Sequence, residues 1–414
     1  MANASRTVAV IGAGAAGLVA AAFAASHGAD VLLIERTADG GKKILISGGG
    51  RCNILPSVLA PERFVTDAPA HLMRGMLKSW PLHEQRAFFE NDVGLPLVLE
   101  EESRKLFPKS NRARDVRDGL VALARARGVR LQFDTSVTAI APGATGFTLT
   151  TSEGSIAAAR VILATGGLSV PATGSDGTGL AIAATLGHRM IETYPALTPL
   201  LGGDPGHAAL SGVSLTARLR GKTGVRTTDT QGGFLFTHRG YSGPSVLDIS
   251  HLITTRSTGS AGSTGSPNSA GSIRAQWSAL DAAAWEHEFE APSSLISTIV
   301  ARHVPARLGE QLMIESGVPT DRRTSNLRRS ERTTLIQRLT SYVLPISGDE
   351  GYKKAEVTGG GVSLDEVDSR TLESRRCQGL YLCGEILDVF GPIGGHNFAW
   401  AWATGRAAGL AAAK

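Results

Sequence analysis

Cysteine is scarce in this sequence of 414 residues, and long apolar runs are absent. Cys52, Cys377 and Cys383 form an odd, widely spaced set without a Cys-x-x-Cys pair, which argues against a disulfide framework and a dithiol redox motif. None of the ten histidines lies at a zinc-ligand spacing from them. No stretch of about 18 or more residues is uniformly apolar, so no membrane span is predicted. The polar residues 1–6 leave no room for a signal peptide before the first strand pattern, so we expect a cytoplasmic protein.

The sequence also has little excess of charge. It contains 42 lysine and arginine residues against 37 acidic residues, a formal net charge of +5 at pH 7. So small a surplus favours ordinary solubility over nucleic-acid binding. Hydrophobic residues make up 42% and charged residues 19%, the balance of a globular protein, which excludes a disordered chain. At roughly 150 residues per domain, the length predicts two or three domains.

A glycine motif connects a predicted strand to a predicted helix. Residues 12–17 read GAGAAG; they follow an apolar run over 7–11 and open an alanine-rich segment that reaches residue 27. A second apolar run covers 29–34. This strand–glycine–helix–strand context is the one that a dinucleotide-binding motif requires, with the pyrophosphate at the helix N-terminus. The predicted contacts are Gly12, Gly14, Ala15, Ala16 and Gly17.

Glu35 stands at the end of the second predicted strand. An acidic side chain there is expected to accept hydrogen bonds from the ribose hydroxyls of the nucleotide, and it disfavours a 2′-phosphate. The bound dinucleotide is therefore expected to be FAD or NAD and not NADP. The neighbouring Arg36 is also a predicted contact.

Two further strands that end in glycine favour FAD over NAD. Residues 161–167 read VILATGG and residues 379–385 read GLYLCGE. In flavoproteins whose nucleotide domain is built from both chain ends, an acidic residue after such a strand bonds the ribityl chain, an element that a simple NAD dehydrogenase does not need. The predicted FAD contacts away from the first motif include Val137, Ala164, Thr165, Gly166, Gly384, Glu385 and Asp388.

Residues 391–397 (GPIGGHN) lead into a predicted final helix. Backbone N–H groups at the start of that helix are expected to face the flavin pyrimidine ring. They would stabilise the negative charge of reduced flavin and raise its reduction potential. The predicted contacts are Gly395, Asn397 and Phe398.

Residues 42–53 read KKILISGGGRCN. Three consecutive glycines allow a close backbone approach and positive φ angles, and the flanking cations suit a phosphate or the flavin edge. Cys52 is better explained as a packed, inert residue than as a catalytic thiol. The predicted contacts are Lys43, Ser47, Gly49, Gly50, Arg51, Cys52 and Asn53.

The order of these motifs predicts an α/β protein. Residues 1–195 and 346–414 are expected to form one Rossmann-like FAD-binding domain from both chain ends. Short alternating runs predict an inserted β-rich domain over 196–290, and a helical pattern predicts a small helical domain over 291–345. Within the first part, helical patterns cover 70–91 and 114–128. The Gly/Ser-rich stretch 257–272 is expected to be a flexible loop.

Together these segments resemble one family, the bacterial NAD(P)/FAD-dependent oxidoreductases of the BaiN/RdsA, or aminoacetone-oxidase-like, type. The resemblance implies a Rossmann-like FAD domain, a β-rich insert and a small helical insert, and it names no substrate. In the family pattern the last glycine-rich loop often reads TGGYN, so Ile393 and His396 replace Thr and Tyr here. The matching segments are VAVIGAGAAGL (8–18), KILISGGGRCN (43–53), FPKSNRARDV (107–116), FLFTHRGYSGPSVLDIS (234–250) and the stretch 357–405.

Candidates for catalysis are few. His238 is a candidate acid or base near neutral pH and Arg239 a candidate carboxylate ligand, with a structural turn as an equally weighted alternative. His396 is a candidate proton relay beside the flavin loop, with a packed histidine as the alternative. No Ser/His/Asp or paired-carboxylate pattern stands out, so hydrolytic chemistry has no support.

A second G-x-G-x-x-G motif is missing, so NADH or NADPH, if used, is expected to dock transiently over the flavin. We predict an FAD-dependent oxidoreductase that transfers a hydride between flavin N5 and either NAD(P)H or a small organic substrate held between the FAD domain and the insert. The alternatives are a flavin sensor without turnover and a flavin-dependent RNA-modifying protein. The RNA alternative is motivated by the net charge and by an arginine run, Arg322, Arg323, Arg328, Arg329 and Arg332. Substrate, donor, acceptor, FAD affinity and oligomeric state stay open.

Overall fold

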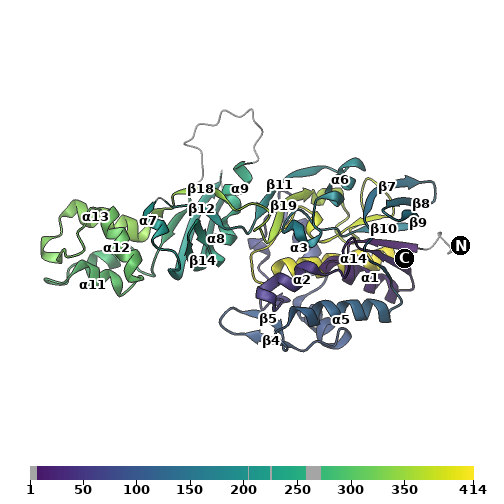
Figure 1. Ribbon diagram of the computed structural model, residues 1–414, viewed down its shortest axis with the longest axis horizontal. Coiled ribbons are helices and arrows are strands. Elements are labelled where there is room, and N and C mark those ends of the chain that lie inside the picture. Colours follow the sequence, from purple (N-terminus) through teal and green to yellow (C-terminus); the bar gives the residue numbers. More distant parts are fainter. Residues whose placement is uncertain (1–6, 204, 224–225, 258–271) are drawn as a thin grey trace. The chain divides into compact units, whose positions relative to one another are not determined.

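The computed structural model describes residues 7–203, 205–223, 226–257 and 272–414 (Figure 1). The chain divides into two compact units, one formed by Met1–Thr193 with Val357–Lys414 and the other by Tyr194–Glu356. Each unit has its own apolar core. The Gly/Ser-rich stretch predicted as a flexible loop lies, for residues 258–271, outside the described residues. The finer boundaries predicted at 195, 290 and 345 stay predictions.

A five-stranded parallel sheet forms the centre of the first unit. Its strand order is β20-β10-β1-β2-β6, so the last strand of the chain lies beside strands from the first half. The apolar runs predicted from the sequence become buried strands because both faces of a parallel sheet are covered. The strands are β1 (Thr7–Ile11), β2 (Asp30–Ile34), β6 (Arg130–Gln132), β10 (Arg160–Leu163) and β20 (Leu380–Leu382).

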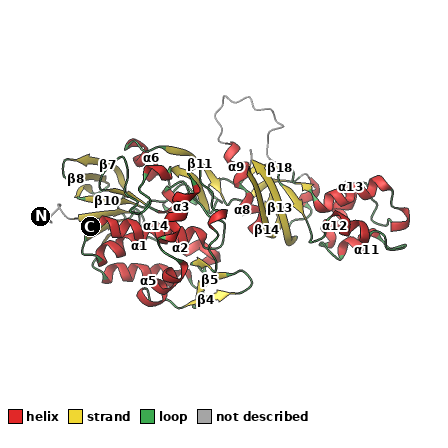
Figure 2. Ribbon diagram, turned by 180° about the vertical axis from the view of Figure 1, so that it is seen from behind, coloured by secondary structure: helices red, strands yellow, loops and turns green. Residues whose placement is uncertain are grey.

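Helices α1 (Ala15–Ser26) and α14 (His396–Ala412) run side by side in both views (Figures 1 and 2). Helix α1 packs against β1, β2 and β10, and α14 packs against β10 and β20. The prediction of an α/β, Rossmann-like domain built from both chain ends is therefore confirmed. The other helices of this unit are α2 (Lys42–Ile46), α3 (Ala70–Lys78), α4 (Leu82–Ala87), α5 (Ala113–Ala126) and α6 (Thr178–Thr185).

Two small antiparallel sheets complete this unit. One has the order β3-β5-β4 and the other β7-β8-β9, and β8 and β9 contact the strands β10 and β1. A two-stranded sheet joins β11 (Met190–Ala196) to β19 (Val357–Val362). The small-sheet strands are β3 (Leu55–Pro56), β4 (Leu97–Glu100), β5 (Lys105–Pro108), β7 (Val137–Gly143), β8 (Gly146–Thr151) and β9 (Gly154–Ala158).

The second unit contains a seven-stranded sheet of order β17-β16-β13-β14-β15-β12-β18, in which neighbouring strands pair antiparallel. Helices α11–α13 gather at one end of this sheet (Figure 2). The strands are β12 (Leu200–Gly202), β13 (Ser214–Thr223), β14 (Arg226–Thr237), β15 (Gly240–Ser242), β16 (Arg274–Gln276), β17 (Tyr342–Val343) and β18 (Ile346–Asp349). The helices are α7 (Pro205–Ala208), α8 (Pro244–Ile249), α9 (His251–Ser257), α10 (Ala282–Glu288), α11 (Ile296–Ala301), α12 (Ala306–Glu315) and α13 (Arg329–Thr340).

Among the described residues, none of the helices combines the length and the apolar character needed to cross a membrane.

Candidate functional site

The glycine motif forms a tight turn between β1 and α1. Gly12 has a φ of +100°, and a Cβ there would lie 2.6 Å from the carbonyl oxygen of Ala164. A Cβ on Gly17 would come closer than 3.0 Å to the carbonyl oxygen of Gly12, so the helix and the strand approach too closely for a side chain. Gly14 differs, because no atom of the described residues other than its chain neighbours lies within 4 Å of the position of its missing Cβ. Helix α1 also starts without a side-chain cap, and this open, uncapped end suits a phosphate group.

Glu35 lies directly after β2 and is buried. Its Oε2 accepts a hydrogen bond from the backbone N–H of Ala13 at 2.7 Å, and its Oε1 accepts from the N–H and the hydroxyl of Thr37 at 2.8 and 2.7 Å. A carboxylate oxygen accepts more than one hydrogen bond, so this oriented group can still take a ribose hydroxyl. The neighbouring Arg36 is exposed and forms an ion pair with Asp176.

Four distant segments meet at a charged cluster near the carboxyl ends of β10 and β20. The ammonium group of Lys43 lies 2.7 Å from Oε2 of Glu385 and 2.6 Å from the hydroxyl of Ser169. Ser169 donates to Oε1 of Glu385 at 2.6 Å, and the N–H of Thr358 donates to the same oxygen at 3.0 Å. Burial acts to raise the pKa of Glu385, but the charge of Lys43 and these hydrogen bonds outweigh it and hold the pKa below its usual value.

Sequence reasoning found Lys43 and Glu385 and missed Ser169. Its only signal is its place a few residues after β10, which ends at Leu163. The intervening turn contains Thr165, whose hydroxyl is buried with no hydrogen-bond partner in the described structure, and Gly166. A Cβ on Gly166 would lie 4.0 Å from Oε2 of Glu385.

The segment after α2 presents bare backbone. Gly48, Gly49 and Gly50 have φ angles of +55°, +67° and +83°. A Cβ placed on Gly49 would have none of the described atoms within 4 Å, its chain neighbours aside. Ser47 and Arg51 are tied to the protein itself: Ser47 donates to the carbonyl of Ile44, and Arg51 pairs with Glu100 at 2.8 Å. The segment therefore offers glycine backbone, not free side chains, to a ligand.

Cys52 follows these glycines with a φ of +60° and a fully buried thiol. Burial raises the pKa of this thiol to about 12, with a hydrogen bond from Ser47 opposing the shift. Such a thiol stays protonated at neutral pH, in agreement with its interpretation as a packed residue.

The loop before α14 is held by side-chain hydrogen bonds. Asn397 accepts from the N–H of Gly391 at 2.8 Å and donates to its carbonyl at 3.0 Å. The Asn53 amide, with its oxygen facing Gly395, accepts from the Gly395 N–H at 3.0 Å and donates to the Leu55 carbonyl at 3.2 Å. Gly395 itself has a φ of +91°. These bonds position the uncapped start of α14 beside the segment that contains Asn53.

Helix α14 also fixes the turn after β20. The hydroxyl of Thr404 accepts from the N–H of Gly384 at 3.0 Å, and the indole of Trp400 donates to the Gly384 carbonyl at 3.1 Å. A Cβ on Gly384 would lie 2.8 Å from the Cβ of Ala16. Phe398 stacks on Trp402 within the same helix.

Asp388 is buried close to this turn. It accepts hydrogen bonds from the N–H of Asp67 at 2.9 Å and from the hydroxyl of Thr66 at 3.3 Å. Burial raises the pKa of its carboxyl group to about 7, although the Asp67 N–H opposes the shift. Asp388 can therefore exchange a proton near neutral pH.

Three other predicted site residues lie on β7 and in the second unit. Val137 is buried at the start of β7. His238 and Arg239 belong to the second unit, where both are exposed in the turn between β14 and β15. Arg239 lies 3.9 Å from Glu350, a weak ion pair. Among the described residues, no group of three or more His, Cys, Asp or Glu side chains is arranged to hold a metal ion.

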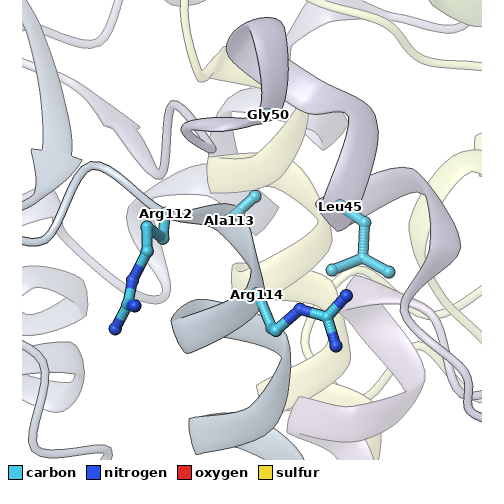
Figure 3. Close-up of a pocket in the computed structure, with 5 residues that line it drawn as sticks. All are labelled: Leu45, Gly50, Arg112, Ala113 and Arg114. Carbon is cyan, nitrogen blue, oxygen red and sulfur yellow. The ribbon is translucent and has the colours of Figure 1, made fainter.

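A cavity of about 400 Å³ lies at the start of α5, and sequence reasoning did not predict it. It is lined by Leu45, Gly50, Arg112, Ala113 and Arg114 (Figure 3). The two guanidinium groups point away from each other in Figure 3, and Arg112 is paired with Asp115 at 3.0 Å. The cavity therefore lacks a convergent set of charges.

Comparison with known proteins gives matches over nearly the full chain. A family model described as HI0933-like protein Rossmann domain matches residues 6–411. Ribosomal RNA dihydrouridine synthase of Escherichia coli is 33% identical over 398 residues, which cover 95% of each chain. The 3-dehydro-bile acid delta(4,6)-reductase of Clostridium scindens is 33% identical over 411 residues, covering 98% of this chain and 99% of that one.

Among solved structures, 3-ketosteroid delta1-dehydrogenase from Sterolibacterium denitrificans aligns with a TM-score of 0.52 and 14% identity over 99% of both chains. At that identity the likeness supports the fold alone.

Proposed function

The chain belongs to the HI0933-like Rossmann family, and from that membership we propose that it is an FAD-dependent reductase acting on a carbon–carbon double bond conjugated to a carbonyl group. The family resemblance seen in the sequence is confirmed, and with it the class of FAD-dependent oxidoreductases. The reacting group and the electron donor are our proposals.

The observation in the structure that supports FAD as the cofactor in this proposal is the Lys43–Ser169–Glu385 cluster. A nucleotide alone needs the open end of α1 and the acidic residue after β2. A flavin dinucleotide also needs polar groups farther along the sheet edge. The cluster, the bare glycines 48–50 and the orphaned Thr165 hydroxyl provide them from three separate segments.

FAD, when bound, supplies the hydride chemistry. The chain's own residues provide binding and orientation. The open approach at Gly14 and the uncapped end of α1 favour a pyrophosphate, and Glu35 takes ribose hydroxyls. Lys43 and Glu385 form an ion pair. The ammonium group can donate hydrogen bonds and the carboxylate can accept them, so the pair suits the polyol chain or the ring of FAD. Asp388 is the buried group suited to hold or release a proton near neutral pH.

The substrate class is inferred from what the relatives' names have in common. A dihydrouridine synthase saturates a ring double bond conjugated to a carbonyl, and a delta(4,6)-reductase acts on ring double bonds of a 3-oxo compound. The two differ greatly in the size of the substrate and share the reacting group. We therefore place the conjugated double bond, and not a particular molecule, at the centre of the proposal.

The test is an anaerobic experiment in two stages. Purified protein reconstituted with FAD is mixed with NADH or NADPH while the flavin absorbance is followed, and bleaching by either identifies a nicotinamide donor that docks without its own Rossmann domain. The reduced protein is then mixed with a 4-ene-3-oxo steroid, with a uridine-containing RNA, or with a saturated ketone as the matched control. Reoxidation by a conjugated compound and not by the control is expected. Protein that takes up no FAD, or is reoxidised by none of the three, contradicts the proposal, and repeated turnover excludes a flavin sensor.

RNA as the substrate is a second candidate, because two relatives are named as ribosomal RNA dihydrouridine synthases. The sequence had disfavoured a nucleic-acid partner, and the relatives reopen that question. The structure weakens the arginine run as its support, since Arg322 pairs with Glu331 and Arg332 with Glu286. Replacing the whole run by glutamine should abolish RNA retention on a filter if the run binds RNA. Retention no greater than that of a neutral control protein would eliminate the candidate.

A further inference from the structure

The central strands of the seven-stranded sheet have one covered face and one exposed face. Leu219 of β13 and Phe234 of β14 are buried. A Cβ on Gly221 would lie 2.5 Å from Cδ1 of Leu252 in α9 and 3.5 Å from Cδ1 of Ile249 in α8, so these two helices cover this face. Side chains alternate along a strand, so the residues between the buried ones point to the opposite face, where they are exposed. We call this the basic sheet face, and it contains Arg218, Arg220, Lys222, Asp229, Gln231 and Arg274.

Positive charge exceeds negative charge on the basic sheet face. It carries four cations against one carboxylate, a surplus of three positive charges on a chain whose total is +5. Arg218, Arg220 and Lys222 stand at alternate positions of β13, with Cα atoms about 6.8 Å apart. The register places Arg220 directly opposite Arg274 of β16, which makes long hydrogen bonds of 3.4 and 3.5 Å to Ser341. Like charges opposite each other destabilise a sheet, so the fold alone gives no reason for this pairing.

The single carboxylate orients two of the arginines and leaves donors free. Asp229 accepts from Nε and a terminal nitrogen of Arg218 at 2.8 and 2.6 Å, and from Nε of Arg220 at 2.9 Å. The hydrogen bond from Arg218 lowers the pKa of Asp229 against the opposing effect of burial, so the carboxylate stays ionised at neutral pH. Within the described residues, the terminal nitrogens of Arg220 and the ammonium group of Lys222 make no hydrogen bond. These exposed donors are available to an anion.

A row of cations with polar neighbours fits the sugar–phosphate backbone of RNA. Phosphate oxygens accept hydrogen bonds from arginine and lysine, and 2′-hydroxyl groups can bond the exposed Thr227 and Gln231 of β14. Sites for unpaired bases need aromatic rings on which the bases stack. The aromatic residues of β13, β14 and β16 are Phe234 and Phe236, and both are buried in the core. The face therefore fits a base-paired stem, whose wide, shallow minor groove presents 2′-hydroxyls.

We propose that the basic sheet face binds the backbone of a base-paired RNA stem, with Arg220, Lys222 and Arg274 as phosphate contacts. The inference rests on the second candidate of the proposed function, RNA as the substrate, and it assigns the contact to this sheet instead of the arginine run. In the run, Arg322 and Arg332 each pair with a separate glutamate, whereas the basic sheet face has one carboxylate for four cations.

The test measures binding of an RNA hairpin, with a stem of about 16 base pairs, to the FAD-loaded full chain at salt concentrations from about 50 to about 200 mM. The variant is Arg220→Gln combined with Lys222→Gln. The matched control is Arg74→Gln combined with Lys78→Gln, which removes one exposed arginine and one exposed lysine from α3. Both variants should melt close to the wild-type temperature, because the replaced side chains are exposed.

The salt dependence separates phosphate contacts from a structural effect. Each phosphate contact adds about 0.9 to the slope of log Kd against log salt, so the double variant on β13 should lower the slope by about 1.8. The same difference in slope makes its affinity roughly 60-fold weaker than that of wild type at about 0.1 M salt, with the two converging toward about 1 M. The control should keep the wild-type slope.

An unchanged slope and Kd in the β13 variant, with wild type still binding the hairpin, would overturn this inference. Loss of binding on replacement of the arginine run, without loss in the β13 variant, would overturn it as well. Single-stranded RNA or a DNA duplex bound as tightly as the hairpin would refute base-paired RNA as the partner. If the double variant does not fold, Lys222→Gln alone is measured and should lower the slope by about 0.9.

The inference and the proposed function fail in different ways. A wild-type protein that takes up FAD and reduces a conjugated ketone but binds no RNA overturns the inference and the RNA candidate, and leaves the reductase standing. A wild-type protein that binds the hairpin but takes up no FAD contradicts the proposed function instead.

Discussion

Helices α1 and α14 approach each other through two glycines, and this contact provides a sharp test of the fold around the site. A Cβ on Gly405 would lie closer than 3.0 Å to the carbonyl oxygen of Ala16, and a Cβ on Gly409 would lie just as close to that of Ala20. The atoms met are backbone, which cannot rotate away. We therefore expect Gly405→Ala to push the two helices apart. Because both helices begin at the candidate site, the change should also weaken FAD binding.

The expected change in the free energy of unfolding of Gly405→Ala is the difference between two opposing effects. Alanine in a helix interior is more favourable than glycine by about 1 kcal/mol. Overpacking against backbone costs about 3 kcal/mol, the upper part of the usual range. The net expectation is a destabilisation of about 2 kcal/mol. For a unit of this size it lowers the melting temperature by roughly 4–8 °C.

Gly75→Ala is the matched control. Gly75 lies in α3 and is exposed. Outside its own helix turn, no atom of the described part of the chain lies within 4 Å of a Cβ placed there. This variant should gain about 1 kcal/mol and melt roughly 2–4 °C higher than wild type. Both variants are compared with wild type by calorimetry of the ligand-free protein and by FAD titration. If Gly405→Ala melts at or above the wild-type temperature, the helices do not touch through this glycine and the reasoning is refuted.

Three further predictions concern separate parts of the chain. Gly14→Ala should leave the melting temperature unchanged but weaken FAD binding more than about tenfold. The added Cβ enters open space where the pyrophosphate is expected, so an unchanged Kd for FAD would place the ligand elsewhere. In the second unit, burial acts to raise the pKa of Glu315, yet hydrogen bonds led by the one from His207 lower it from 4.5 to about 2. The lowered pKa adds up to about 3 kcal/mol to the free energy of unfolding above pH 4.5, and this contribution is lost as the pH falls toward 2. The urea midpoint of wild type should therefore drop between pH 5 and 3, and that of Glu315→Gln should drop much less. Iodoacetamide at pH 8 should modify the partly exposed Cys377 well before the buried Cys52, because the thiol of Cys52 has a pKa of about 12. Mass spectrometry follows the two modification rates, and equal rates would show that Cys52 is accessible.

Predictions that depended only on residues adjacent in the sequence agree with the structure for the first strand, the first helix and the turn between them. The strand over 7–11, the helix that follows it and the turn at Gly12 are set by spacing and by a positive φ, both of which are local properties. The helical pattern over 70–91 was only partly right. It divides into α3 and α4 because Pro81 cannot continue the first helix, and a short π-helical turn follows at Phe88–Asp92.

The candidate site needed more than local pattern. Lys43, Glu385 and Gly384 stand in motifs that the sequence displays, but nothing near Ser169 announces its part in the cluster. Its partners are separated from it by 126 and 216 residues. The five-stranded sheet brings them together, because parallel strands place their carboxyl ends at one edge whatever their distance in the chain.

The sequence by itself therefore determined the fold class, the glycine turn between β1 and α1 and the family, since each depends on short spacings that a chain carries in any conformation. The tertiary structure alone decided which charges neutralise each other, as at Glu385, and which polar atoms stay unpaired among the described residues, as at the hydroxyl of Thr165. Burial and partner distance exist only after distant segments have packed, and these two quantities set the chemistry of a side chain.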